Sequence, residues 1–225
     1  MTKTDEGFAA YPQRAYVRAK PRFYPSYGKR AMDIGLVLLA LPAVLVLIFG
    51  LALVLALVQG GSPFFGHRRI GRDGQAFTCW KLRTMVPHAE ACLQDYLQQN
   101  PQAAQEWRDT FKLANDPRVT TFGKIMRQTS LDELPQIWNI LKGEMSLVGP
   151  RPVTAAEAVL YGPALAKYQA LRPGLTGVWQ VNGRNDTSYG ARVAMDVEYG
   201  NRLSFWRDCR ILLATVRAVA ARSGR

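Results

Sequence analysis

The strongest pattern in the sequence is a long apolar segment near its beginning. Residues 34–58 carry no charged side chain and consist mainly of Leu, Val, Ala and Ile. A helix of this length can cross a hydrocarbon core of about 30 Å. A cleavable signal peptide fits poorly, because the segment begins late, is too long and lacks a clear small-residue cleavage site after it. We therefore expect a membrane helix, with a buried helix of a globular domain as the alternative.

Basic residues flank this segment on both sides. They are Lys29 and Arg30 before it, and Arg68, Arg69 and Arg72 after it. Cytoplasmic segments next to membrane helices collect Lys and Arg, so both ends should face the cytoplasm. Pro42 can kink the helix, because proline lacks a backbone N–H and clashes with the preceding turn. We predict a re-entrant, proline-broken helix that returns to the cytoplasmic face; a straight span is the alternative.

The remaining pattern predicts short elements. Four segments stand out: a hairpin over 62–80 with a turn at Arg72-Asp73-Gly74, polar helices over 89–113, an interrupted helix over 155–171, and a helix with apolar and basic faces over 196–219. The last helix either lies on an anionic membrane surface or packs in the core. We expect a mostly α fold with small β elements (α+β), in three parts. These parts are a basic arm (1–28), the membrane helix hairpin (29–60) and a cytoplasmic or interfacial domain (61–225).

Composition narrows the choice of partners. The chain of 225 residues has a net charge of +12 at pH 7, which favours nucleic acid, lipid headgroups or a phosphorylated substrate. Its three cysteines lie far apart and its two histidines have no partner in sequence. The sequence therefore argues against a disulfide framework and against a zinc site.

The candidate chemistry is concentrated in residues 127–151. Asp132 and Glu133 are adjacent and precede Pro135, which must lie near the start of a helix. A helix N-terminus favours negative charge and also a bound phosphate. The structural alternative is a capping box, in which Ser130 and Glu133 do no more than start the helix.

A carboxylate in such a place could attack a phosphoryl group and hold it covalently. Two neighbouring carboxylates repel an anionic substrate, so the site would need a divalent cation and arginines. Magnesium suits a site of oxygen ligands, and we predict Asp132 and Glu133 as its ligands. Arg127 and Arg151 are predicted to clamp phosphate, because guanidinium is planar and binds in a bidentate way.

Further cations and amides are candidates for binding phosphate or a nucleotide. They are Lys81 and Arg83 in an extended segment, and Arg172, Asn182 and Arg184 in the loop that follows residue 171. Two arginines on either side of a tryptophan and several amide side chains can bind an anion. The structural alternative for the two cations of the extended segment is that they are solvated edge charges.

Several short sequence motifs follow one another along this chain. They are Lys81-Leu-Arg-Thr-Met85, Ser130-Leu-Asp-Glu-Leu-Pro135, Lys142-Gly-Glu-Met-Ser146, Gly149-Pro-Arg-Pro152, and the stretch Arg172–Arg184. With the basic arm and the broken apolar helix, they resemble the monotopic phosphoglycosyl transferases, the bacterial sugar transferase family. The resemblance covers roughly residues 29–223 and is specific because of the shared order. One departure is Leu41-Pro42, where some members have Ser-Pro.

This resemblance implies transfer of a sugar 1-phosphate from a UDP-sugar to undecaprenyl phosphate, with release of UMP, at the start of exopolysaccharide, capsule or O-antigen assembly. It implies that Asp132 is the nucleophile of a phosphosugar-aspartyl intermediate and that Glu133 goes with Mg²⁺. It also implies a monotopic protein of the bacterial inner membrane, with its catalytic domain on the cytoplasmic face. The single-domain length and Trp179-Gln180 resemble the hexose-1-phosphate enzymes, so galactose or glucose is expected. A homo-oligomer is left open.

Two other functions remain alternatives. The charge of +12 suits a membrane-tethered nucleic-acid-binding protein, although the cations are spread along the chain. Asp196-x-Glu198 could be the acid pair of a metal-dependent glycosyltransferase that releases UDP, although such pairs are frequent by chance.

Overall fold

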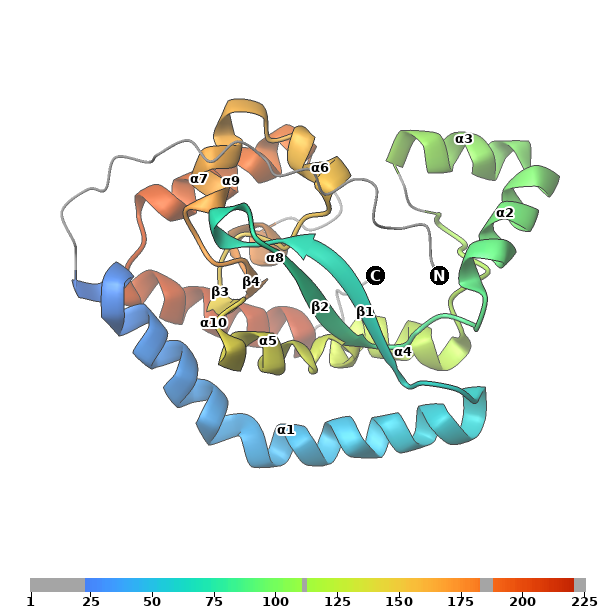
Figure 1. Cartoon of the computed structure of the whole chain (residues 1–225), viewed down its shortest axis with the longest axis horizontal. Coiled ribbons are helices and arrows are strands. Elements are labelled where there is room, and N and C mark those ends of the chain that lie inside the picture. The colour runs from blue at the N-terminus through green and yellow to red at the C-terminus, as the bar shows by residue number, and fades with distance from the viewer. Residues whose placement is uncertain (1–22, 111–112, 183–187, 221–225) are drawn as a thin grey trace.

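The computed structural model describes residues 23–110, 113–182 and 188–220. Figure 1 shows one long N-terminal helix along one side of a group of shorter helices and small sheets. The predicted fold, mostly α with small β elements, is confirmed.

The elements are mostly short. The α-helices are α1 (Lys29–Gln59), α2 (Ala89–Gln99), α3 (Pro101–Thr110), α4 (Thr121–Thr129), α5 (Gln136–Lys142), α6 (Ala155–Val159), α7 (Leu165–Gln169), α8 (Val178–Asn182), α9 (Tyr189–Asn201) and α10 (Phe205–Ala220). A π-helical turn, η1 (Tyr24–Gly28), precedes them, and the 3₁₀ turns are η2 (Arg72–Gly74), η3 (Leu131–Glu133) and η4 (Gly162–Ala164). The strands β1 (Phe64–Ile70) and β2 (Ala76–Leu82) pair antiparallel, and β3 (Ser146–Val148) and β4 (Gly174–Thr176) pair parallel.

Helix α1 is long and apolar enough to cross a membrane. Only 17% of its most apolar 18-residue stretch is buried, and Leu39, Leu53 and Leu57 are exposed. A buried helix of a globular domain would instead hide these side chains, so that alternative is not supported. The helix contains Pro42 and bends in Figure 1, which agrees with a kink; the re-entrant course stays a prediction.

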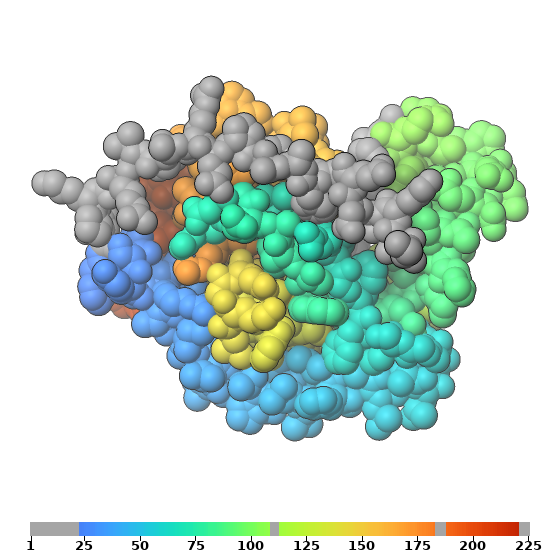
Figure 2. All heavy atoms as spheres, viewed as in Figure 1, coloured from blue at the N-terminus to red at the C-terminus, as the bar shows by residue number. Residues whose placement is uncertain are grey.

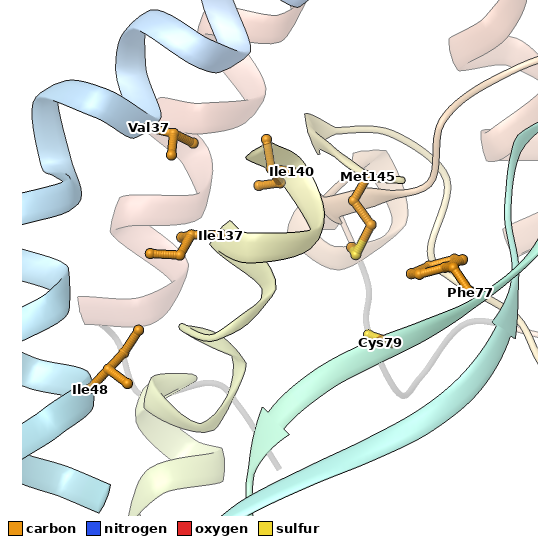
Figure 3. Packing of buried hydrophobic residues seen from close by; sticks show 7 residues of the cluster. All are labelled: Val37, Ile48, Phe77, Cys79, Ile137, Ile140 and Met145. Carbon is orange, nitrogen blue, oxygen red and sulfur yellow. The ribbon is translucent and has the colours of Figure 1, made fainter. Parts of the chain in front are cut away.

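The inner side of α1 packs on α5. Figure 3 shows Val37 and Ile48, from two parts of α1, directed at Ile137 and Ile140 of α5. On the far side of α5 the same cluster continues to Met145 and to the buried residues of β2. In Figure 2 the yellow segment that contains α5 lies between α1 and the hairpin. Helix α5 is therefore the centre of the core.

The predicted hairpin is confirmed, with its turn at Arg72–Gly74. A side chain of α5 binds its second strand: Asn139 Nδ2 donates to Thr78 O at 2.7 Å, and Trp80 N donates to Asn139 Oδ1 at 3.1 Å. A buried amide with both ends paired fixes the strand along the helix. This pairing places the end of β2 beside the residues that precede α5.

The predicted capping box at Ser130 is wrong. Ser130 ends α4 in the left-handed region, with φ of 58°, and its side chain caps no backbone N–H. An N-cap residue needs an extended backbone, which this conformation excludes. Asp132 and Glu133 lie on η3, and α5 begins only at Gln136. The acids therefore occupy a separate turn immediately before the helix.

Two other segments differ from their predicted form. The predicted loop over 172–186 contains β4 and α8, and residues 183–187 lie outside the described part. The predicted helix over 196–219 is divided between α9 and α10. The predicted interruption within 155–171 is confirmed, because η4 separates α6 from α7.

A buried polar network joins the start of α1 to α10. Asp208 is fully buried and accepts from Tyr24 Oη at 2.6 Å, Lys29 Nζ at 2.8 Å and Tyr199 Oη at 2.8 Å. Such a carboxylate stabilises the fold because three donors satisfy it, and its removal would leave Lys29, which is 12% exposed, with only the longer 3.8 Å pair to Asp33.

We therefore predict that Asp208→Ala lowers the free energy of unfolding by about 3 kcal/mol, which corresponds to a fall in Tm of roughly 6–12 °C. Thermal unfolding of the detergent-solubilised protein measures this change. Exposed Asp95 of α2 provides the matched control, and Asp95→Ala should leave Tm nearly unchanged. Equal Tm values for the two variants would contradict the stabilising role of the network.

Candidate active site

The end of β2 and the turn η3 meet through an ion pair. Lys81 Nζ lies 2.6 Å from Glu133 Oε1, and both side chains keep about a quarter of their surface exposed. Lys81 belongs to a strand held by α5, and Glu133 to the turn before α5. The helix therefore positions both partners of the pair.

Asp132 precedes Glu133 and is buried. Burial raises the pKa of Asp132 to about 6, and the negative charge of Glu133 adds to this effect. Lys81 and Arg127 oppose the rise because a nearby cation favours the carboxylate. The result is an acid that is ionised at neutral pH but is poorly solvated, which suits a nucleophile.

The pKa of Glu133 is shifted in the opposite direction, downward. Burial works to raise its pKa, but Lys81 first, and then Arg151 and Arg69, hold that pKa below its usual range. Two adjacent carboxylates are thus separated in their ionisation by their surroundings. Paired acids with separated pKa values are typical of catalytic sites that assign different roles to each acid.

Arg127 is held by a close contact between α4 and the segment after β2. Its Nε donates to Oγ1 of buried Thr84 at 2.9 Å. Helix α4 can come this near because residue 123 is glycine; a Cβ there would lie 2.0 Å from Thr84 O. The geometry directs the charge of Arg127 at Asp132, whose pKa it lowers.

A small polar pocket adjoins the ion pair. It is lined by Arg69, Cys79, Lys81, Glu133, Gln136, Arg151, Pro152, Gly174, Leu175 and Gln180. Arg151 enters it from the turn after β3. That turn packs tightly on β4, since a Cβ on Gly149 would lie 2.5 Å from Arg172 O. A larger, open hollow near Phe205 is almost wholly apolar and shares no residue with this pocket.

The structure gathers five of the predicted residues and places the others elsewhere. Lys81, Arg127, Asp132, Glu133 and Arg151 are the ones brought together around the acids. They come from four separate segments, namely β2, α4, η3 and the turn after β3, so the fold assembles the site. Positive charge dominates around the two carboxylates, as an anionic substrate requires.

The other predicted binding residues do not line the pocket. Arg83 donates to Gly60 O at the end of α1, and Arg172 Nε donates to Gly143 O at 2.8 Å at the end of α5. Helix ends leave carbonyl groups unpaired, and these attract cationic donors. Asn182 is exposed at the end of α8. Arg184 lies outside the described residues.

The pocket-lining residues that the sequence analysis does not predict include Arg69 and Gln136. Arg69 was interpreted only as a flanking charge, yet its Nη1 lies 2.9 Å from Glu157 Oε2 and it lines the pocket. Gln136 begins α5 and is buried in the pocket wall. The register of the hairpin could have indicated Arg69, but nothing in the local sequence distinguishes Gln136 from a core-facing helix residue.

The second acid pair does not assemble. Asp196 is buried and accepts from Tyr161 Oη at 2.7 Å, whereas Glu198 lies 3.3 Å from Arg207 and 3.5 Å from Arg202 at the surface. Residues two apart on a helix point to different sides. Asp196 and Glu198 are therefore not positioned to hold one metal ion together, which removes the observation behind the metal-dependent glycosyltransferase hypothesis.

All three cysteines are free. Cys79, Cys92 and Cys209 form no disulfide. Cys79 contributes to the core and to the pocket wall, where burial raises the pKa of its thiol.

Comparison with known proteins agrees with this arrangement. Residues 24–222 match the family described as bacterial sugar transferase. The chain is similar to the exopolysaccharide production protein ExoY of Sinorhizobium fredii, with 49% identity over 88% of this chain and 87% of that protein. It is 46% identical to the UDP-galactose-lipid carrier transferase of Erwinia amylovora over 87% of this chain, but it spans only 41% of that protein.

A third relative is named for glucose. The UDP-glucose:undecaprenyl-phosphate glucose-1-phosphate transferase of Caulobacter vibrioides is 41% identical over 87% of this chain and 71% of that protein. The family match covers most of the chain, including every element that builds the pocket. The chain therefore belongs to the bacterial sugar transferase family.

Proposed function

We propose that this phosphoglycosyl transferase moves hexose 1-phosphate from a UDP-sugar to undecaprenyl phosphate and releases UMP, through a covalent intermediate on Asp132. Relatives named for galactose and for glucose support a hexose. The relative named for exopolysaccharide production supports a role at the start of polysaccharide assembly.

One observation carries this proposal: two adjacent acids have pKa values shifted in opposite directions beside a pocket edged by cations, and Glu133 lines that pocket. Glu133 stays ionised through its pair with Lys81, while Asp132 is buried, has a pKa of about 6 and makes no comparable ion pair with any residue that the structure describes. A carboxylate that is not engaged in an ion pair keeps its lone pairs for attack on phosphorus.

In the first step a carboxylate oxygen of Asp132 attacks the β-phosphorus of the UDP-sugar. The new O–P bond forms as the bond from that phosphorus to the bridging oxygen breaks, and the electron pair leaves with UMP. Arg127 and Arg151 would bind the phosphate oxygens on which charge develops; the charge of Arg127 acts on Asp132, and Arg151 lines the pocket. Lys81 fixes Glu133 and lowers the repulsion between substrate and protein.

In the second step a phosphate oxygen of undecaprenyl phosphate attacks the same phosphorus. The O–P bond to Asp132 breaks, and the carboxylate is regenerated without gain or loss of a proton. Such a double displacement divides one difficult transfer into two steps. Helix α1, packed directly on α5, would keep the acids close to the lipid that carries the acceptor.

Magnesium is a proposed cofactor, and the donor set fits it. Asp132 and Glu133 offer adjacent carboxylates, and Lys81 occupies only one oxygen of Glu133. Mg²⁺ in proteins is usually held by one or two carboxylates, water and substrate phosphates. When bound, the metal would neutralise charge on the diphosphate.

The orientation proposed is that of a monotopic protein at the cytoplasmic face of the inner membrane. Basic residues lie on both flanks of α1, and Pro42 lies inside it. A UDP-sugar is a cytoplasmic substrate, so the pocket must open on that side.

Asp132→Asn should lower UMP release by at least roughly 10³-fold with UDP-galactose or UDP-glucose and polyprenol phosphate, because the amide is a far poorer nucleophile. The assay measures UMP and UDP separately. Release of UDP by the wild type would indicate direct glycosyl transfer. Salt-sensitive oligonucleotide binding without turnover would favour the nucleic-acid alternative.

The control for Asp132→Asn is a measurement of its thermal stability, which shows whether the variant is folded. The pKa of Asp132 is raised in the fold, so its contribution to stability is present at low pH and is lost as the pH rises through about 6. Asparagine carries no charge, and Asp132→Asn should therefore unfold at the same or a higher Tm at pH 8. Normal UMP release by this well-folded variant would refute the nucleophile assignment.

The pH profile provides a second prediction. At limiting donor concentration, UMP release should fall about tenfold for each pH unit below 6, because only the ionised Asp132 attacks. Lys81→Gln removes a cation that lowers the pKa of Asp132, so the acid limb should move to higher pH. If the acid limb of the pH profile lies at the same pH in Lys81→Gln as in the wild type, the assignment of this titration to Asp132 is contradicted.

Chelation provides a third prediction. EDTA should reduce UMP release to the background rate, and excess Mg²⁺ should restore it, since adjacent carboxylates need a cation to accept a diphosphate. The same buffer without EDTA is the control. An undiminished rate in EDTA would exclude magnesium.

A further inference from the structure

A second polar cluster lies beside the pocket and has no role in the steps above. Its centre is Arg192 of α9, which is 5% exposed. The guanidinium carbon lies 5.1 Å from the centroid of the Trp179 ring and 5.0 Å from that of Tyr189. Two aromatic rings therefore hold this cation in a fixed place.

The guanidinium group of Arg192 has hydrogen-bond donors without acceptors in the part of the chain that the structure describes. Among the described residues, Nε and Nη2 of Arg192 are buried without a hydrogen-bond partner, and Nη1 approaches Glu157 Oε1 only to 3.8 Å. Nε1 of Trp179 is also buried without an acceptor in this part of the chain. Buried donors without acceptors are costly, so three such N–H groups at one place indicate a ligand rich in acceptors.

This cluster is joined to the pocket on two sides. Arg151, which lines the pocket, lies over the same Trp179 ring at 5.5 Å. Glu157 pairs with Arg192 and, at 2.9 Å, with Arg69 of the pocket wall. The donors of Arg192 therefore lie next to the place where the proposed reaction holds its diphosphate.

The charges around Arg192 favour an anion. Three arginines, Arg69, Arg151 and Arg192, face two carboxylates, Glu157 and Asp196, so one positive charge is left over. Asp196 lies near Arg192 as well, and Tyr161 and Tyr189 pack beside them. The hexose of the donor carries no charge, whereas its nucleotide carries a phosphate that is one bridging oxygen from the attacked phosphorus.

We propose that Arg192, with the indole N–H of Trp179, binds the α-phosphate of the UDP-sugar and holds the leaving UMP. This inference rests on the proposed function and names the residues of its nucleotide subsite. A planar guanidinium with two free N–H groups matches two phosphate oxygens, and a permanent cation favours departure of the phosphate.

The experiment measures binding without catalysis. Affinities of UMP and of uridine are determined by calorimetry on Asp132→Asn protein, with and without Arg192→Gln. We expect Arg192→Gln to weaken UMP binding at least roughly tenfold, the loss typical of a charged hydrogen bond. Uridine lacks the phosphate, so its affinity should change less than about twofold. In the active enzyme, the KM for the UDP-sugar should rise while the KM for polyprenol phosphate stays unchanged.

Arg118→Gln is the matched control. Arg118 also stacks on a tryptophan, 4.9 Å from the Trp107 ring, and its Nη2 lies 2.7 Å from Asp116, but it lines no part of the pocket. Its substitution should leave UMP affinity unchanged. If Arg192→Gln does not fold, Arg192→Lys keeps the charge without the planar fork and should still bind UMP more weakly than the parent protein.

Two results would overturn the inference. One is unchanged UMP affinity in the Arg192 variant that folds, and the other is an equal loss for UMP and uridine, which would mean a merely structural role. Failure of the proposed function gives a different result: the wild type would then release no UMP from a UDP-sugar, whatever the behaviour of Arg192 variants.

Discussion

The ion pair between Lys81 and Glu133 is the interaction on which the site depends. It joins the hairpin to the turn before α5, and it keeps one of two adjacent acids ionised and engaged. Asp132 is left as the poorly solvated partner, with a pKa of about 6. Without this pair, two neighbouring carboxylates would share one environment, and neither would be distinguished for the proposed attack on phosphorus.

Helix α5 connects that pair to the membrane helix. Its Asn139 binds β2 on one side, and Ile137 and Ile140 pack against α1 on the other (Figure 3). The network around Asp208 fixes the beginning of α1 to α10 in the same way. An apolar helix with most of its surface exposed, tied rigidly to the acid turn, suits an enzyme whose acceptor stays in the lipid while its donor arrives from water.

Sequence reasoning succeeded where a strong local pattern sets the structure. The charge-free segment and the Asp73-Gly74 turn belong to this class, and the adjacent acids were found because Pro135 limits where a helix can begin. It failed at Ser130, where the left-handed end of α4 overrides a capping-box pattern. Arg83 and Arg172, which the sequence analysis predicts to bind phosphate, instead donate to backbone carbonyls at helix ends. Arg192 was not found, because its neighbours come from α6 and α8, and no spacing in the chain reveals such contacts.

The most direct test of the account is to trap the intermediate. The protein is incubated with a UDP-hexose labelled in its β-phosphate, without polyprenol phosphate, and its peptides are mapped by mass spectrometry. The account predicts one hexose phosphate on Asp132, in the peptide between Arg127 and Lys142, and its loss when polyprenol phosphate is added. An unmodified Asp132 in protein that still releases UMP and loads its lipid at the normal rate would contradict it.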